Sequence, residues 1–353
     1  MIKYLGSKRL LVEHIVSLCT DLRPDRCSVL DLFSGTSRVG HALKHAGFGV
    51  LANDHNSFAH TLAVCYIQTH GPGIRCDAQR IIDELNALPG RDGPFTRSYS
   101  VESRYFHPDN ARRIEAMRDR IESLDLEPEL RAVVLTSLIE GADRVDSTTG
   151  VQMAYLKSWA PRALKPIELR LPRVLPNPDG MPCRAFGLDA LEAAHGLSAD
   201  IAYLDPPYNQ HSYLGNYHVW ESLVRWDHPE TYGVACKRVD CKQRKSDFNS
   251  KVRIHDALRR VIDAVDVPTL IVSFNNEGYL TREQIEAMLT PLGPVAVIDH
   301  DHPRYVGCRI GIHNQRGEKV GRVGRLRNTE HFFIAGDGAG RFVETGGAVA
   351  VAG

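Results

Sequence analysis

The sequence predicts an α/β protein with a mostly parallel sheet, into which a largely helical unit is inserted. Residues 28–69 show a strand, helix, strand, helix pattern. Residues 71–182 contain no clear pair of strands, and Arg-rich amphipathic stretches take their place. The pattern of apolar strands and amphipathic helices resumes at residue 183. We therefore expect one sheet domain made of residues 1–70 and 183–335, with a helical insertion at residues 71–182.

The first half of the sheet is predicted from short segments with clear turn or stop signals between them. Residues 28–33 form an apolar run before a glycine-containing turn, which indicates a buried strand. Residues 38–47 indicate a helix, because Gly47 provides a C-terminal stop signal. Residues 48–53 indicate a second strand, and residues 57–69 a second helix. Strands joined through a helix in this way form a right-handed βαβ unit.

The insertion and the second half of the sheet follow from weaker patterns. Within the insertion, residues 109–124 and 127–140 are amphipathic, and Pro- and Gly-rich joints flank the unit. Thr281 and Gln284 form the pattern of a capping box at the start of a late helix. Beyond the insertion we expect strands at residues 183–186, 200–204, 269–274, 295–298 and 331–335, and helices at residues 252–265 and 281–289.

Three other segments are expected to lie outside the regular elements. Residues 209–250 are long and polar, and we interpret them as a loop segment over the functional site. Residues 311–327 look like a basic hairpin around Gln315-Arg316-Gly317, so that the last strand is antiparallel. Residues 336–353 are rich in Gly and Ala, which predicts a flexible tail.

The composition is that of a globular protein. Lys+Arg and Asp+Glu each total 43, and this balance argues mildly against a nucleic-acid enzyme, although a local basic face can still bind DNA. No apolar run approaches the ~20 residues of a membrane helix, and the N-terminus lacks a signal-peptide core. The eight cysteines include no Cys-x-x-Cys pair, so we expect free thiols, a cytoplasmic protein and no metal site.

A candidate cofactor turn follows the first predicted strand. Asp31, Phe33, Ser34 and Gly35 lie where a strand passes into a helix, and ligands of such sheets bind at the carboxyl ends of the strands. Asp54 ends the second strand, where a carboxylate can accept hydrogen bonds from ribose hydroxyls. No G-x-G-x-x-G pattern is present, which favours an adenosyl ligand without a pyrophosphate. A structural joint remains the alternative for the turn, and a helix N-cap is an equally good reading of Asp54.

The N-terminal string from Lys3 to Lys8 is a second candidate. Gly6 permits a close approach of backbone to a ligand, Tyr4 supplies a ring, and Lys8 supplies a cation for a ligand carboxylate. The alternative is a disordered basic terminus.

The tetrad Asp205-Pro206-Pro207-Tyr208 follows the apolar strand predicted at residues 200–204. Two prolines remove two backbone donors and fix φ twice, which leaves a stiff loop with outward carbonyls. A carboxylate and a carbonyl that each accept one N–H can localise the lone pair of a planar amine and stabilise the positive charge of its methylation. The ring of Tyr208 can stack on a base flipped out of a duplex. The alternative is a Pro-Pro turn with Asp205 as a cap.

These motifs, in this order, resemble those of the Dam-type, alpha-class DNA adenine-N6 methyltransferases. In that family a Lys/Tyr-x-Gly-x-Lys element, a D-x-F-x-G turn, an acidic ribose-binding residue and a G-D element precede D-P-P-Y. Residues 3–8, 31–35 and 205–208 match three of these elements, and Asp54 matches the acid. Gly187-Leu188-Asp189 stands at the G-D element, although Leu188 intervenes, and Ser37 replaces the last glycine of the turn.

The resemblance implies a Rossmann-like methyltransferase fold that uses S-adenosylmethionine, releases S-adenosylhomocysteine and needs no metal. Double-stranded DNA would be the substrate, and a cognate restriction endonuclease a partner of a monomer or weak dimer. Asp54 would hold the ribose and Asp189 the adenine amine of the cofactor. The residues expected around its methionine part or the glycine turn are Tyr4, Gly6, Lys8, Asp31, Phe33, Ser34, Gly35 and Asp205.

Basic residues after the tetrad are the expected DNA contacts, because cations pair with phosphates. These residues are Lys237, Arg238, Lys242, Arg244 and Lys245. The Arg residues of the insertion are a second candidate set, but Glu115, Asp119 and Glu122 favour an ion-paired helix face for residues 112–120. Trp220 and Leu223 have the spacing of core residues.

Two other classes of function remain open. The tetrad chemistry also serves cytosine N4, RNA adenine or a protein glutamine. A non-catalytic nucleic-acid-binding relic is less favoured, because both the tetrad and the cofactor turn are present. The absence of a glycine fingerprint disfavours a nicotinamide oxidoreductase.

Overall fold

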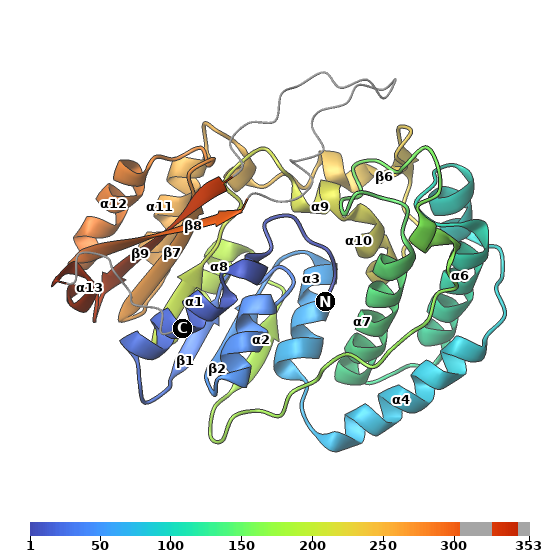
Figure 1. Cartoon of the computed structure of the whole chain (residues 1–353), viewed down its shortest axis with the longest axis horizontal. Coiled ribbons are helices and arrows are strands. Elements are labelled where there is room, and N and C mark those ends of the chain that lie inside the picture. The colour runs from blue at the N-terminus through green and yellow to red at the C-terminus, as the bar shows by residue number, and fades with distance from the viewer. Residues whose placement is uncertain (304–326, 345–353) are drawn as a thin grey trace.

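The computed structural model describes residues 1–303 and 327–344, and within them seven strands form one sheet with helices on both faces (Figure 1). The strand order is β3-β2-β1-β4-β7-β9-β8. β9 runs antiparallel to both of its neighbours, whereas the other pairs are parallel. The bounds are β1 (Ser28–Asp31), β2 (Gly49–Asn53), β3 (Cys183–Phe186), β4 (Ile201–Leu204), β7 (Thr269–Asn275), β8 (Val295–Pro303) and β9 (Arg327–Gly336). This confirms the predicted α/β class and its antiparallel C-terminal strand.

Alternate side chains of the central strands supply two hydrophobic layers. Val29 packs with the layer of α1 (Val12–Leu22), α2 (Arg38–His45) and α3 (Ser57–Ala63). Leu30, the next residue, packs with the layer of α8 (Ala190–Gly196), α11 (Ile254–Ala264) and α12 (Arg282–Leu289). Because successive strand residues point to opposite faces, both faces of the sheet are covered. The predicted capping box at Thr281 and Gln284 is confirmed at the start of α12.

The insertion is helical, as expected. Its main helices are α4 (Pro72–Ala87), α6 (Pro108–Ser123) and α7 (Pro128–Val145), each with a proline in the first turn, where no intrahelical donor is lost. Short pieces complete it: α5 (Pro94–Thr96), a π-helical segment Arg97–Val101 and a 3₁₀ turn Pro161–Leu164. Ile114 and Leu138 belong to the same hydrophobic cluster as α1, α2 and α3. The insertion therefore packs directly onto the sheet domain, at the end opposite α12 and α13 (Figure 1).

The segment at residues 209–250 is more structured than a loop. It contains α9 (Tyr213–Asn216), α10 (His218–Arg225), a hairpin of β5 (Thr231–Tyr232) and β6 (Lys237–Arg238), and two 3₁₀ turns, Val239–Lys242 and Asp247–Asn249. Trp220 and Leu223 of α10 are buried, which confirms their assignment to the core. Its polar side chains His218, Glu221 and Ser222 are buried as well, because the helix lies between other parts of the protein.

The beginning of the expected tail is also ordered. Residues after Gly336 form a turn and the short helix α13 (Gly340–Glu344), and both Ala339 and Phe342 are buried. The prediction of a flexible tail is therefore wrong up to residue 344, because two apolar side chains fix the segment to the core. The predicted basic hairpin at residues 311–327 lies outside the described residues, except for Arg327 at its end.

Candidate active site

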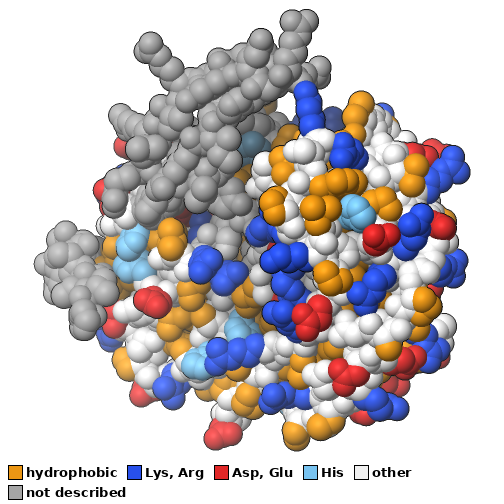
Figure 2. Space-filling view, turned by 45° about the vertical axis from the view of Figure 1, so that its right-hand side comes forward, with side chains coloured by type: hydrophobic (Ala, Val, Ile, Leu, Met, Phe, Trp, Pro, Cys, Tyr) orange, Lys and Arg blue, Asp and Glu red, His pale blue; other side chains and the backbone are white. Residues whose placement is uncertain are grey.

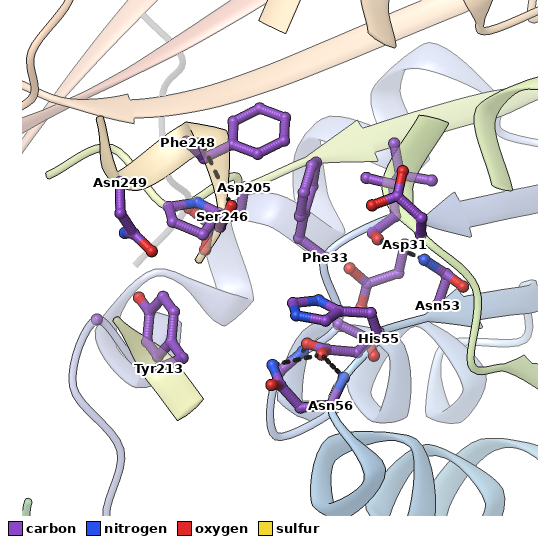
Figure 3. Close-up of a pocket in the computed structure, with 18 of the residues that line it drawn as sticks. Asp31, Phe33, Asn53, His55, Asn56, Asp205, Tyr213, Ser246, Phe248 and Asn249 are labelled. Atoms are coloured by element: carbon purple, nitrogen blue, oxygen red, sulfur yellow. Dashed lines mark hydrogen bonds between the residues drawn. The ribbon is translucent and has the colours of Figure 1, made fainter. Parts of the chain in front are cut away.

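A cavity of about 520 Å³ opens at the carboxyl ends of β1, β2 and β4. This is the size range of small-molecule sites, and it lies where ligands bind in open α/β sheets. Figure 3 shows Tyr213 and Asn249 on one side of it and Asn53, His55 and Asn56 on the other. Its walls include all of the predicted cofactor residues, namely Tyr4, Gly6, Lys8, Asp31, Phe33, Ser34, Gly35, Asp54, Asp189 and Asp205.

The turn after β1 is closed by Asp54. The Gly35 amide donates to Asp54 Oδ2 at 3.1 Å, and the other carboxylate oxygen accepts from the Asn56 amide at 2.9 Å. Asn56, rather than Asp54, occupies the N-cap position of α3, which removes the simple N-cap alternative for Asp54. Gly35 has φ +50°, and a Cβ there would lie 3.2 Å from the ring of Tyr4. Glycine is therefore favoured here by the backbone conformation, and a larger residue would also crowd the ring of Tyr4.

Ser37 adopts the left-handed conformation that the family's glycine would adopt, with φ 57° and ψ 22° at the N-cap of α2. Its side chain is fully buried, and its hydroxyl has no hydrogen-bond partner. A non-glycine residue in this region costs roughly 1–2 kcal/mol. The turn thus keeps the expected geometry at the cost of local strain.

Ser37→Gly is expected to raise the free energy of unfolding by about 1 kcal/mol, because relief of strain exceeds the added entropy of the unfolded chain. Urea unfolding measures the change. Ala42→Gly, inside the same helix, is the matched control and should lower stability by about 1 kcal/mol. A loss of stability in Ser37→Gly would show that the turn is unstrained.

Asp31 and Asp189 lie at two further points of the cavity wall. Asp31 is 1% exposed at the end of β1, and burial, together with the nearby Asp205, raises the pKa of Asp31 to about 7. Asp189 caps α8: its carboxylate accepts from the Leu191 amide, and its own amide donates to the carboxylate of Glu192. The loop before α8 is thereby fixed at the rim of the cavity.

The N-terminal segment is packed against the cavity, which argues against a disordered terminus. The ring of Tyr4 stacks between Tyr213 and Tyr217, at centroid distances of 5.0 and 4.7 Å. The Leu5 amide donates to the Tyr217 hydroxyl at 2.5 Å. Gly6 has φ +74°, and a Cβ there would lie 2.8 Å from the Tyr213 hydroxyl. The aromatic residues after the tetrad therefore hold the terminus in place.

The tetrad forms the turn that leaves β4. Asp205 and Pro207 line the cavity, whereas Pro206 is buried. The ring of Tyr208 packs against Phe274 at a centroid distance of 5.3 Å, and its carbonyl accepts from the Tyr279 amide. Residues 273–278, at the end of β7, thus support the tetrad from behind.

Asp205 pairs with Lys8, whose ammonium lies 2.9 Å from Asp205 Oδ1 and 2.6 Å from Glu330 Oε1. Lys8 was expected at the methionine part of a cofactor, but its ammonium pairs with these two carboxylates and lies 5.9 Å from the centroid of the Tyr208 ring. Burial raises the pKa of Asp205 to about 6, Lys8 opposes the shift and Glu330 adds to it. Sequence reasoning did not identify Glu330, since β9 is joined to β7 by pairing that no local motif signals.

A second wall of the cavity comes from residues 244–249, within the segment that was expected to lie over the functional site. The ring of Phe248 packs edge-on against the ring of Phe33, with a centroid distance of 5.2 Å, and both rings line the cavity (Figure 3). Arg244 holds this wall, because its guanidinium pairs with the buried Glu221 at 2.9 Å and reaches the His55 carbonyl at 3.4 Å. Its observed contacts thus argue against the prediction that Arg244 is free to bind phosphate.

The other predicted DNA contacts differ in how far their side chains are buried. Arg238 is 2% exposed and pairs with Asp227 at 2.7 Å and with Asp240 at 3.1 Å, so its charge is compensated inside the protein. We withdraw it as a DNA contact. Lys237 is half-buried, whereas Lys242 and Lys245 are exposed. Blue side chains of Lys and Arg gather in the middle of the face shown in Figure 2.

The contacts of the arginines in the insertion agree with the interpretation of residues 112–120 as an ion-paired helix face. Arg112 pairs with Asp92, and Arg120 pairs with Glu84. Arg118 is wholly buried. Within residues 1–303 and 327–344, no three His, Cys, Asp or Glu side chains are grouped as a metal site. No helix of the described chain is long and apolar enough to cross a membrane.

The sheet order and the cavity at its carboxyl edge define a Rossmann-like methyltransferase fold. The profile of the D12 class N6 adenine-specific DNA methyltransferases matches residues 4–288. The chain therefore belongs to the D12 class of N6 adenine-specific DNA methyltransferases, and it shares this family with site-specific modification enzymes.

Three relatives illustrate the range of lengths in the family. Modification methylase StsI of Streptococcus sanguinis is 31% identical over 313 residues, which are 84% of this chain and 47% of that protein. Type II methyltransferase M.NlaIII of Neisseria lactamica is 28% identical over 328 residues, 90% of this chain and 96% of that protein. Type II methyltransferase M.FokI of Planomicrobium okeanokoites is 30% identical over 308 residues, 82% of this chain and 47% of that protein. The chain thus spans about half the length of two of these relatives.

Proposed function

We propose that this chain transfers a methyl group from S-adenosylmethionine to the N6 amine of an adenine flipped out of duplex DNA. The observation that carries the proposal is the place of Asp205. It ends a central parallel strand, lines the cavity and is followed by the rigid Pro-Pro turn. Family membership supports adenine in DNA over the other planar amines.

The residues of the cavity fit S-adenosylmethionine. Asp54 is placed to accept hydrogen bonds from ribose hydroxyls, and Phe33 and Phe248 offer apolar faces. Asp31 lines the cavity at the end of β1 and is a candidate to receive a ligand donor such as the methionine amine. Tyr4 and Gly6 complete that end of the cavity. When bound, the cofactor supplies an electrophilic methyl group on a sulfonium, and no metal is required for that chemistry.

The chain's own contribution is to make the adenine amine nucleophilic. One Asp205 oxygen is held by Lys8, so the other can accept an N–H of the base, while a tetrad carbonyl accepts the second N–H. This arrangement localises the nitrogen lone pair and stabilises the positive charge that grows on nitrogen. The ring of Tyr208, supported by Phe274, provides a face on which the flipped base can stack.

Methylation assays with radiolabelled S-adenosylmethionine test the proposal on duplex DNA, RNA and protein in parallel. We expect label in DNA, recovered as N6-methyladenine after digestion. Label recovered only as N4-methylcytosine, or only in RNA or protein, would show that the substrate is not adenine in DNA. Calorimetric titration with S-adenosylmethionine separates an enzyme from a non-catalytic relic, because a relic should give no heat of binding.

The relatives named as Type II methyltransferases suggest that this chain, too, serves a restriction-modification system with a cognate endonuclease. The insertion and the segment at residues 209–250 would then contact the DNA around the base pocket. We retain Lys237, Lys242 and Lys245 as phosphate contacts, because Lys245 lines the cavity, Lys237 lies in β6 of the hairpin and Lys242 ends the 3₁₀ turn that follows it.

Lys242→Gln/Lys245→Gln is expected to weaken DNA binding and to reduce the slope of log Kd against log salt by about 2, one counterion for each lost phosphate contact. Fluorescence anisotropy with a labelled duplex at several salt concentrations measures the slope. Arg112→Gln/Arg120→Gln is the matched control, because both guanidinium groups are already paired within the protein. Equal slopes in the wild type and Lys242→Gln/Lys245→Gln would place the DNA elsewhere.

A further inference from the structure

One short turn contacts both the cofactor turn and the loop that follows the tetrad. It is the 3₁₀ turn Asp247–Asn249. Phe248, in the middle of the turn, packs against Phe33 of the cofactor turn. Asn249, the next residue, also lines the cavity, but Figure 3 shows that its side chain leaves the turn in a different direction from that of Phe248. Two neighbouring side chains therefore face two different parts of the site.

The side-chain amide of Asn249 binds the loop directly after the tetrad. Its Nδ2 donates to the carbonyl of Asn209 at 2.8 Å and to the carbonyl of His211 at 3.1 Å. An amide NH₂ group has two protons to donate, so both are used on this one loop. The loop is also closed from within, because Asn209 Oδ1 accepts from the His211 amide at 3.0 Å. Asn249 therefore fixes the path of the chain where it leaves Tyr208.

The same loop has a second support, which comes from the segment after β7. The Tyr279 amide donates to the Tyr208 carbonyl at 2.9 Å, and the Tyr279 hydroxyl donates to Gln210 Oε1 at 3.3 Å. The support from Asn249 differs from this one, because Asn249 lines the cavity in which we place the cofactor. The position of the loop can therefore respond to what occupies the cavity.

The segment that carries Asn249 is tied to the cofactor turn at a second point. Arg244 reaches the carbonyl of His55, the residue after Asp54, at 3.4 Å. Ser246 begins the 3₁₀ turn, and its hydroxyl accepts from the Phe248 amide at 3.3 Å. Residues 244–249 thus form a continuous chain of contacts from the cofactor side of the cavity to the loop after the tetrad. Such a chain of packed and hydrogen-bonded groups can carry energetic coupling between two sites.

We propose that Asn249 is a positioning residue, which holds the tetrad loop from the cofactor side and so couples cofactor binding to the binding of the flipped base. The inference rests on the proposed function and deepens it. A turn that is fixed at Phe248 by an occupied cavity also fixes Asn249, and with it the loop after Asp205 and Tyr208. Coupling of this kind is reciprocal, so each ligand tightens the binding of the other. Asn249 acts through the loop carbonyls and not on the reacting atoms.

The first test measures DNA affinity with and without S-adenosylhomocysteine, which fills the cofactor site without allowing turnover. The probe is a labelled duplex that the methylation assays have shown to be a substrate, and fluorescence anisotropy gives its Kd. In the wild type we expect S-adenosylhomocysteine to tighten DNA binding on the order of tenfold. Asn249→Asp keeps the shape of the side chain but replaces both donors by an acceptor. In this variant we expect a change of less than about twofold.

Two further measurements distinguish the two ends of the turn. In Asn249→Asp the Kd for S-adenosylhomocysteine alone should stay close to wild type, because Phe33 and Phe248 are retained. Its kcat should fall on the order of tenfold, because the tetrad loop is less accurately placed. Phe248→Leu changes the cofactor end of the turn, so it should weaken both the binding of S-adenosylhomocysteine and the coupling to DNA.

Asn110→Asp is the matched control. The Asn110 amide also donates to two carbonyls, those of Ala163 at 2.9 Å and Lys165 at 2.8 Å, but it is buried inside the insertion. Its loss should lower the melting temperature at least as much as Asn249→Asp does, because Asn249 is only half-buried. The coupling between S-adenosylhomocysteine and DNA should stay as in the wild type. An equal loss of coupling in both variants would show a general loosening and overturn the inference.

Asn249→Ala removes the two donors without introducing a charge, and it replaces Asn249→Asp if thermal melts show that the latter does not fold. The same loss of coupling is expected. The inference is overturned by a wild type that methylates DNA adenine but binds DNA equally well with and without S-adenosylhomocysteine, or by unchanged coupling in the folded Asn249 variant. A wild type that binds S-adenosylhomocysteine but methylates no DNA adenine would contradict the proposed function instead.

Discussion

Asp205→Ala should lower kcat by roughly 10³-fold, on the scale of losing one group that stabilises transition-state charge, while the Kd for S-adenosylmethionine stays close to wild type. The reason is that, in the proposed mechanism, Asp205 acts on the charge that develops on the adenine nitrogen, whereas the proposed cofactor site also includes Asp31, Asp54 and the Gly35 turn. A residue that stabilises only the transition state changes kcat more than binding.

Single-turnover methylation of a DNA duplex and calorimetric titration of the cofactor measure the two quantities separately. Asp200→Asn is the matched control, because Asp200 lies at the amino end of the same strand and binds Ser28 away from the cavity. It should leave kcat unchanged. A collapse of cofactor binding in Asp205→Ala, with normal turnover at saturation, would assign Asp205 to the cofactor instead.

The features that could be predicted from the sequence are those encoded within a few residues. The turn at residues 31–35 and the tetrad are local motifs, and each follows an apolar strand, so their meeting at one sheet edge follows from parallel pairing. The left-handed Ser37 shows that the fold keeps the turn geometry even where glycine is replaced.

The features that escaped prediction depend on contacts between distant segments. Glu330 reaches Lys8 because β9 pairs with β7, and nothing near residue 330 signals that pairing. Arg238 looked like a phosphate ligand, but its guanidinium is paired with Asp227 and Asp240, which lie on either side of it in the segment around its own hairpin. A count of charges along the chain cannot show which cations are already neutralised.

The joint between the insertion and the catalytic segment depends on Arg118, one of the arginines first considered for DNA. It is 0% exposed on α6, and its guanidinium donates to the carbonyls of Leu223 and Val224 at 2.7 and 3.1 Å. These carbonyls end α10 and have no helical donor of their own. The ring of Trp226 covers the guanidinium at 5.1 Å. The charge therefore caps a buried helix end instead of meeting a phosphate.

Arg118→Met should lower the free energy of unfolding by about 3 kcal/mol, because two buried carbonyls lose a charged donor while the aliphatic volume is kept. Urea unfolding measures the loss, and Arg120→Met, which removes only an exposed pair with Glu84, should change stability by less than about 0.5 kcal/mol. Equal stability of the two variants would show that α6 does not support α10.

The effect of Arg118→Met should reach the active site through α10. This helix carries Glu221, whose carboxylate accepts from the Phe58 amide at the start of α3 and pairs with Arg244 on the cavity wall. A displaced α10 would therefore loosen residues 244–249, and we expect a weaker Kd for S-adenosylmethionine in Arg118→Met than in Arg120→Met. Unchanged cofactor affinity in a destabilised Arg118→Met would confine the role of Arg118 to folding and separate the insertion from the cofactor site.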